Sequence, residues 1–420
     1  MLGFCSVRSS RVLSLMLCSA ACLFVMVFAF SCDSGTRIQK LHVEERKKFD
    51  ALDFVKIFQI DLYGRWCLAC PNGIVCSENL DRNNREYKFS LYNYSGALIR
   101  DRRILAGQGP TDIQGGNLNT VWLSSSGKIF CLDVGDYLKT IDPETLEVET
   151  IAKLSNVIDG YGSRFTTGRI SGTLLEEKDG RIVTTFESSG FPEDFTYYLV
   201  SFTSAFQNFA VIATERKEKP LGWKKLEASR RKGKGQLESF VDYYNRLRLD
   251  RIFSVDWKRD VVYLIPDIEK PEIERVDLVS KQRVNHRIDI DISKFGIERE
   301  EFDLYNEYIA SETPEMLKQI IKETLYIPSH APALMGIMTI DDRLLLITGN
   351  RNWKKGENES LVYRLPDMHY EGSFFIPYSN TQKTKWYDPI YINVNRIKKD
   401  DDYSWRYEIY KVEDRGRQDR

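Results

Sequence analysis

The chain has 420 residues, with 60 basic and 61 acidic side chains and a net charge of −1. Apolar residues make up 42% and charged residues 29%, which excludes a disordered chain and is ordinary for a folded domain. The balanced charge gives no basic excess for a nucleic-acid partner, and four histidines leave little imidazole for metal or acid–base chemistry.

Residues 1–31 are predicted to be a secretory signal. Two arginines precede an uncharged run from Val12 to Phe30, which leads to Ser31 and Cys32. This ending resembles a bacterial lipobox, in the bulky variant found in Bacteroidetes lipoproteins. The resemblance implies cleavage before Cys32 and lipidation of its thiol, so that acyl chains hold the protein at a membrane surface. Simple secretion and an uncleaved transmembrane anchor are the alternatives.

Residues 32–50 are polar and charged, and we expect them to form a tether. After the signal and the anchor the chain keeps four cysteines: Cys67, Cys70, Cys76 and Cys131. An exported protein meets an oxidising compartment, so a disulfide is allowed. Cys70 and Cys76 are one candidate pair, because a Pro-Asn-Gly turn brings them close, although sequence alone does not fix the pairing.

Residues 51–415 are predicted to form an all-β, six-bladed propeller of four-stranded antiparallel blades. The strongest signal is a run of short alternating strands joined by tight turns, such as Asn72-Gly73 and Asp142-Pro143-Glu144-Thr145. The six blades are expected at Trp66–Arg100, Asn119–Ile151, Ser171–Thr214, Arg251–Leu278, Ala333–Met368 and Ser373–Val412. An earlier strand, Phe54–Ile60, is expected to join the last sheet and close the ring.

Two helical insertions are expected within the propeller, at about 216–249 and about 298–324. In the first, apolar residues recur at helical spacing after a strongly basic run, which we interpret as a solvated loop rather than a nucleic-acid site. In the second, Thr313 followed by Pro314 is a suitable helix start.

The loop Gly107-Gln108-Gly109-Pro110 resembles the G-x-G-P signature of six-bladed propeller lipoproteins of Bacteroidetes, grouped with TolB-like and NHL-like propellers. The segments Tyr326–Leu334 and Thr339–Leu345 look like another blade opening of that family. The resemblance covers roughly residues 50 to 412. It implies a propeller fold and an envelope location, and because it implies no activity, it carries over no catalytic residue.

Two motifs resemble a redox site and a phosphate-binding loop, but the residues that follow each of them do not fit those functions. Trp66-Cys67-Leu68-Ala69-Cys70 resembles the thioredoxin W-C-x-x-C, but a Pro-Asn-Gly turn follows where a helix would have to begin. The Gly107-Gln108-Gly109 loop lacks the lysine and the helix of a phosphate-binding loop, so a blade connection is the better interpretation. No cofactor and no metal site are predicted, since the cysteines and histidines form no close ligand set.

Four residues are candidate ligand contacts: Arg164, His330, Trp353 and Trp386. The tryptophans lie in blade-connecting loops, where exposed rings can stack on sugars, and burial as loop anchors is the alternative. His330 lies between two prolines near a blade start, facing either the central funnel or a structural partner.

The function favoured by these observations is a membrane-anchored propeller that binds an envelope protein, a peptide or a glycan. We expect a monomer in the cell envelope, at a periplasmic or outer-membrane face. A glycan hydrolase or lyase acting in the propeller funnel is the alternative enzyme hypothesis, and a structural envelope component is a third. An enzyme would need converging titratable side chains on funnel-facing loops.

Overall fold

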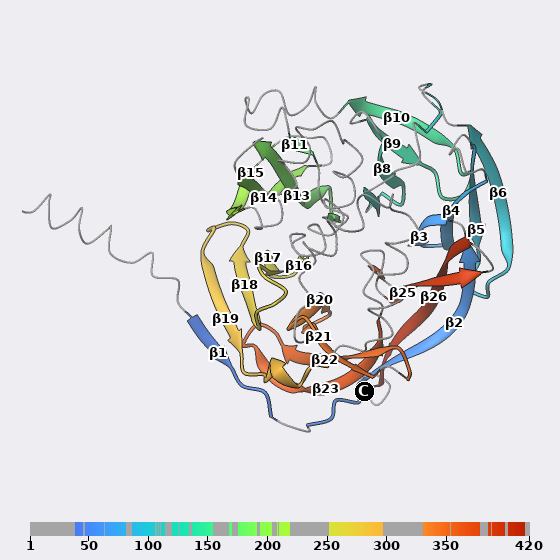
Figure 1. Ribbon diagram of the computed structural model, residues 1–420. Coiled ribbons are helices and arrows are strands. Elements are labelled where there is room, and N and C mark those ends of the chain that lie inside the picture. The colour runs from blue at the N-terminus through green and yellow to red at the C-terminus, as the bar shows by residue number, and fades with distance from the viewer. Residues whose placement is uncertain are drawn as a thin grey trace, which may run out of the picture.

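The structure is a computed structural model, and it is an all-β ring of six sheets (Figure 1). It describes residues 38–44, 47–62, 64–80, 86–105, 107, 109, 111–113, 120–124, 126–133, 137–153, 168–169, 175–190, 194–203, 208, 210–218, 252–296, 331–352, 354–378, 385–387, 389–399 and 402–415. The signal, both predicted insertions apart from residues 216–218, and most of the loop candidates lie outside these ranges. In the described part no helix is long and apolar enough to cross a bilayer.

The first three blades follow the predicted order. Blade 1 contains β3 (Gly64–Cys70), β4 (Gly73–Asn79), β5 (Glu86–Tyr92) and β6 (Leu98–Leu105). Blade 2 contains β7 (Thr120–Leu123), β8 (Ile129–Asp133), β9 (Tyr137–Ile141) and β10 (Val148–Lys153). Blade 3 contains β12 (Leu175–Lys178), β13 (Arg181–Gly190), β14 (Asp194–Thr203) and β15 (Ala210–Glu218), with the short β11 (Gly168–Arg169) also paired to β13.

The last three blades differ in detail from the prediction. Blade 4 contains β16 (Ile252–Asp256), β17 (Val261–Ile265), β18 (Glu272–Asp277) and β19 (Arg283–Ile288), and β1 (Ile38–Leu41) is added to its edge. Blade 5 contains β20 (Leu334–Ile340), β21 (Arg343–Asn352), β22 (Glu357–Arg364) and β23 (His369–Pro377). The predicted boundary was therefore wrong, because residues 373–377 complete blade 5 instead of opening blade 6.

Blade 6 closes the ring by joining the two ends of the propeller. It contains β24 (Lys385–Tyr387), β25 (Ile390–Lys399), β26 (Asp402–Asp414) and, from the beginning of the chain, β2 (Leu52–Leu62). The pairing runs antiparallel from Leu52 opposite Asp414 to Leu62 opposite Trp405. The predicted closure is confirmed.

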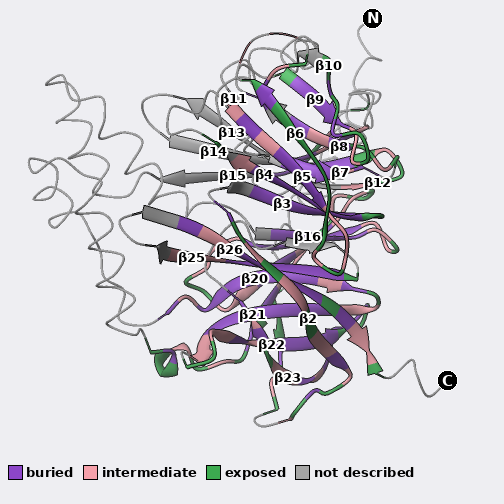
Figure 2. Cartoon of the chain, turned by 90° about the vertical axis from the view of Figure 1, so that its right-hand side faces the viewer, coloured by how far each residue is buried: buried purple, intermediate pink, exposed green. Residues whose placement is uncertain are grey.

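Buried residues run along the described strands (Figure 2), and the core clusters that they form contain residues of neighbouring blades. In β17, Val261, Tyr263 and Ile265 belong to a cluster shared with blade 5. Val262 and Leu264, on the other face, belong to a cluster that includes blade 3 residues. This arrangement explains why the whole segment is buried and apolar instead of alternating.

Charged side chains also join neighbouring blades. The first hairpins of blades 3, 4 and 5 end in tight turns that hold Asp179, Asp260 and Asp341 in the left-handed region, a conformation that aspartate tolerates. Ion pairs next to these turns connect successive blades: Arg181–Asp260, Arg259–Asp342 and Arg343–Asp414. Because these pairs are at least partly exposed, they favour the register between blades more than they add stability.

The segment predicted to be a tether is docked where the structure describes it. Residues 38–41 pair in parallel with β19, and Lys48 forms a parallel bridge with Ser373 of β23. Leu41 and Phe49 are buried. Val43 is partly buried against the same core. The polar composition of this stretch hid its role, because its few apolar side chains are scattered among charged ones.

Candidate functional site

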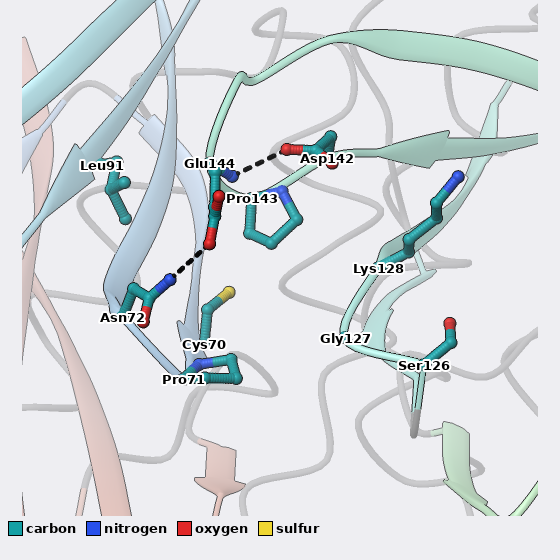
Figure 3. Close-up of a pocket in the computed structure, with 10 residues that line it drawn as sticks. All are labelled: Cys70, Pro71, Asn72, Leu91, Ser126, Gly127, Lys128, Asp142, Pro143 and Glu144. Carbon is teal, nitrogen blue, oxygen red and sulfur yellow. Dashed lines mark hydrogen bonds between the residues drawn. The ribbon is translucent and has the colours of Figure 1, made fainter.

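A pocket of about 290 Å³ lies where hairpin turns of blades 1 and 2 meet (Figure 3). Cys70, Pro71 and Asn72 come from the first turn of blade 1, and Leu91 comes from β5. The blade 2 side of the lining is Ser126, Gly127, Lys128, Asp142, Pro143 and Glu144, from its two turns.

Backbone chemistry shapes the turn that carries Asp142. Its Oδ1 accepts hydrogen bonds from the backbone N–H groups of Glu144 at 2.9 Å and Thr145 at 2.8 Å. These bonds, with a smaller contribution from Lys128, lower the pKa of the Asp142 carboxyl. The residue after the turn, Leu146, has a φ of 59° and is fully buried, which fixes the turn against the core. Asp142 therefore stabilises the turn that forms one side of the pocket.

Glu144 connects the two blades across the pocket. Its Oε1 accepts a hydrogen bond of 2.7 Å from the Asn72 side-chain amide (Figure 3). Asn72 stands on a turn completed by Gly73, whose φ is +151° and whose missing Cβ would lie 2.0 Å from the Tyr92 carbonyl oxygen. Only glycine fits there, so the Asn-Gly turn positions the amide. The lining of the pocket thus includes a lysine, two acidic residues and an asparagine.

Cys70 contributes a thiol with no nucleophilic character. Burial raises its pKa to about 12, so the thiol stays protonated at neutral pH. Its carbonyl oxygen accepts a hydrogen bond from the Tyr94 hydroxyl, which fixes the backbone at this point. The W-C-x-x-C segment lies in β3 and is followed by β4, not by a helix. This geometry confirms that the motif belongs to a hairpin.

The structure pairs Cys67 with Cys76, and the candidate pair Cys70–Cys76 was wrong. A two-residue turn at Pro71-Asn72 places Cys67 directly opposite Cys76, with 4.1 Å between the two Cα atoms. Cys70 lies opposite Gly73, and its side chain packs in the cluster shared with blade 2. The disulfide instead faces blade 6.

Removing this disulfide is expected to lower the free energy of unfolding by about 3 kcal/mol, the chain-entropy value for a closed loop of roughly ten residues. The test compares urea unfolding of the oxidised protein with that of a Cys67→Ala/Cys76→Ala variant. Cys70→Ala serves as the matched control, and adding a reductant is expected to destabilise it as much as the wild type. A double variant as stable as the oxidised wild type would contradict the pairing.

The glycine-rich loop connects blades 1 and 2, and a carboxylate within the loop accepts a hydrogen bond from its backbone. The Asp112 Oδ2 atom accepts a hydrogen bond of 3.0 Å from the Gly109 N–H. A Cβ on Gly107 or Gly109 would lie 2.2 or 2.6 Å from that same oxygen. The Asp112 carboxylate therefore explains both glycines. The loop packs over the buried pair Lys139–Asp133, because Lys139 also donates to the Asp112 carbonyl.

The candidate ligand contacts of the sequence stay predictions. Arg164, His330 and Trp353 lie outside the described residues, as does Cys32. Trp386 lies in β24 opposite Tyr391, but its side chain is not described. Within the described part of the chain no group of three or more His, Cys, Asp or Glu residues is placed to hold a metal ion.

The pocket residues were not predicted, although each of their turns was. Asn-Gly, Ser-Gly and Asp-Pro-Glu-Thr turns are visible in the sequence, but nothing in it shows that turns of successive blades converge.

Comparison with known proteins adds distant likenesses only. No protein-family model and no curated protein matches the chain. Apo AztD from Citrobacter koseri is similar over 74% of this chain and 59% of its own, with 10% identity and a TM-score of 0.28. The extracellular domain of the putative hybrid two component system BT4673 from B. thetaiotaomicron is similar over 86% of this chain and 43% of its own, with 7% identity and a TM-score of 0.33. The fold assignment therefore depends on the strand pairing described above.

Proposed function

We propose that this protein is a lipid-anchored envelope lipoprotein whose propeller acts as a binding module for a protein, a peptide or a glycan. The observation that carries the binding role is the pocket between blades 1 and 2. Its lining includes Lys128, Glu144 and Asn72, whose ammonium, carboxylate and amide groups suit the amide, hydroxyl and charged groups of such ligands.

Export and anchoring rest on two separate features. The lipobox-like ending at Cys32 supports acylation, and the Cys67–Cys76 disulfide supports a compartment outside the reducing cytosol. The G-x-G-P loop and the six blades fit the lipoprotein family that the sequence resembles. A glycan hydrolase or lyase and a purely structural component stay alternative outcomes of the experiment below.

In-cell photo-crosslinking tests the binding role. A photoreactive benzoylphenylalanine at Ser126, in the pocket lining, is compared with the same group at Leu105, which is 66% exposed on β6. We expect a crosslinked species from Ser126 alone, and a yield at least tenfold lower when Lys128→Gln and Glu144→Gln are added. Mass spectrometry of the adduct separates protein or peptide from glycan.

Identical adducts from both positions, or none from either, would contradict the binding proposal. The enzyme alternative has its own readout, because a hydrolase or lyase releases new reducing or unsaturated ends from an envelope polysaccharide fraction. If the wild type releases such ends and the Lys128→Gln/Glu144→Gln variant does not, the pocket is catalytic and the binding proposal is wrong.

A further inference from the structure

The N-terminal segment is fixed to the propeller from its first described residue. Ile38 to Leu41 pair in parallel with β19 of blade 4, on the outer side of the ring (Figure 1). The Leu41 side chain is buried, and its carbonyl oxygen accepts a hydrogen bond of 3.0 Å from the Asp289 N–H. This strand addition uses main-chain hydrogen bonds and a buried apolar anchor, as an added edge strand does.

The segment stays attached as it passes blade 5. Phe49 donates its N–H to the Ser373 carbonyl at 2.9 Å, and its ring lies 5.6 Å from that of Phe374. At Gly372 a Cβ would lie 2.9 Å from the Lys47 carbonyl oxygen, so the two backbones are in close contact. The chain then enters β2 of blade 6. Attachment to three successive blades fixes where the chain leaves the propeller.

Little chain is left between this attachment and the proposed acyl anchor. Five residues separate Cys32 from Ile38. At about 3.5 Å per residue, six steps reach at most about 20 Å, however extended the chain is. The point where β1 begins must therefore lie close to the membrane that holds the acyl chains.

The register shows which part of the propeller lies at that point. Ile38 pairs with Asn285, near the start of β19, so the chain arrives beside the turn between β18 and β19. Ile38 is 66% exposed, and Val279 in that turn is 74% exposed. Lys40 and Arg287 are register partners on the exposed edge. We call Ile38, Lys40, Val279 and Arg287 the blade 4 corner.

We propose that the blade 4 corner touches the lipid bilayer that holds the Cys32 acyl chains, so that the propeller has a fixed orientation on the membrane. This inference rests on the proposed lipidation. The exposed apolar side chains of the blade 4 corner suit the boundary between lipid headgroups and acyl chains, and its basic side chains suit anionic lipid headgroups. Blade 1 lies three blades away round the ring, so the pocket is held away from this contact.

Site-specific fluorescence quenching tests the orientation. The lipidated protein is incorporated into vesicles of neutral and anionic phospholipid that contain a nitroxide-labelled lipid, with a fluorophore on Val279→Cys or on Leu98→Cys. Leu98 is the matched control, because it is 54% exposed and follows the corresponding turn of the opposite blade. The native Cys70 and Cys131 are buried and have raised pKa values, so they do not react with the label.

We expect at least threefold stronger quenching at Val279 than at Leu98, and loss of the difference when a flexible 20-residue linker separates Arg37 from Ile38. Equal quenching at both sites in protein that floats with the vesicles would overturn the orientation and leave the lipidation standing. Protein that carries no acyl group and does not float would overturn both.

Discussion

Replacing Lys139 by methionine is expected to lower the free energy of unfolding by about 3–5 kcal/mol, the usual cost of removing one partner of a buried ion pair. The Lys139 Nζ atom lies 3.0 Å from Asp133 Oδ2, and the two side chains are 3% and 0% exposed. The same ammonium donates to the Asp112 carbonyl in the glycine-rich loop. The substitution therefore removes the counter-charge of a buried carboxylate and a contact between the loop and blade 2.

Two further variants separate this effect from lost packing. Lys40→Met changes an exposed lysine in the same way and is expected to leave stability within about 0.5 kcal/mol of the wild type. A Lys139→Met/Asp133→Leu double variant removes both charges and is expected to be more stable than Lys139→Met alone. Urea unfolding at pH 7 measures all three. A loss below about 1 kcal/mol for Lys139→Met would contradict the role of this pair.

Lowering the pH from 7 to 4 is expected to destabilise the protein partly through His286. This side chain is 3% exposed in β19, and neither ring nitrogen has a hydrogen-bond partner. Burial, with a smaller contribution from the Arg275 guanidinium, lowers its pKa to about 4. The unfolded chain binds the proton more readily, at about pH 6.5, so stability is fully present above that value and is lost as the pH falls toward 4. The loss from this group alone is about 3 kcal/mol.

A His286→Leu variant tests this prediction. Its unfolding free energy is expected to fall less than that of the wild type between pH 7 and pH 4.5, because the titrating group is gone. His42→Leu is the matched control, since the His42 side chain is 90% exposed, and its pH dependence is expected to follow the wild type. Parallel pH profiles for wild type and His286→Leu would show that the histidine does not titrate as described.

Most of the fold was predictable because most blades are formed by strands that follow one another in the sequence. Asn72-Gly73 marks a turn by its backbone requirement, and the alternating strands on either side define a hairpin. That two-residue turn also fixes the register, so Cys67 opposite Cys76 was implied by counting outward from it. The segment Ile38–Leu41 was missed for a physical reason, because an added edge strand with one buried side chain shows no alternation.

The candidate site was much less predictable than the fold. Glu144 and Asn72 are 72 residues apart, and their hydrogen bond depends on how two blades stand beside each other. Sequence patterns report local periodicity and turns, not the relative placement of successive sheets. The same limit hid one partner of Lys139, the Asp112 carbonyl oxygen, which lies in the loop that leaves blade 1.

Intact-mass analysis and membrane fractionation of the protein, made in a bacterial host with a lipoprotein pathway, test whether the chain is a lipoprotein. We predict a mature chain that begins at Cys32, carries a thioether-linked diacylglycerol and an N-acyl group, and sediments with membranes, whereas a Cys32→Ser variant carries no acyl group. A mature chain without acyl groups in the soluble fraction, or an uncleaved chain held by residues 12–30, would contradict the account.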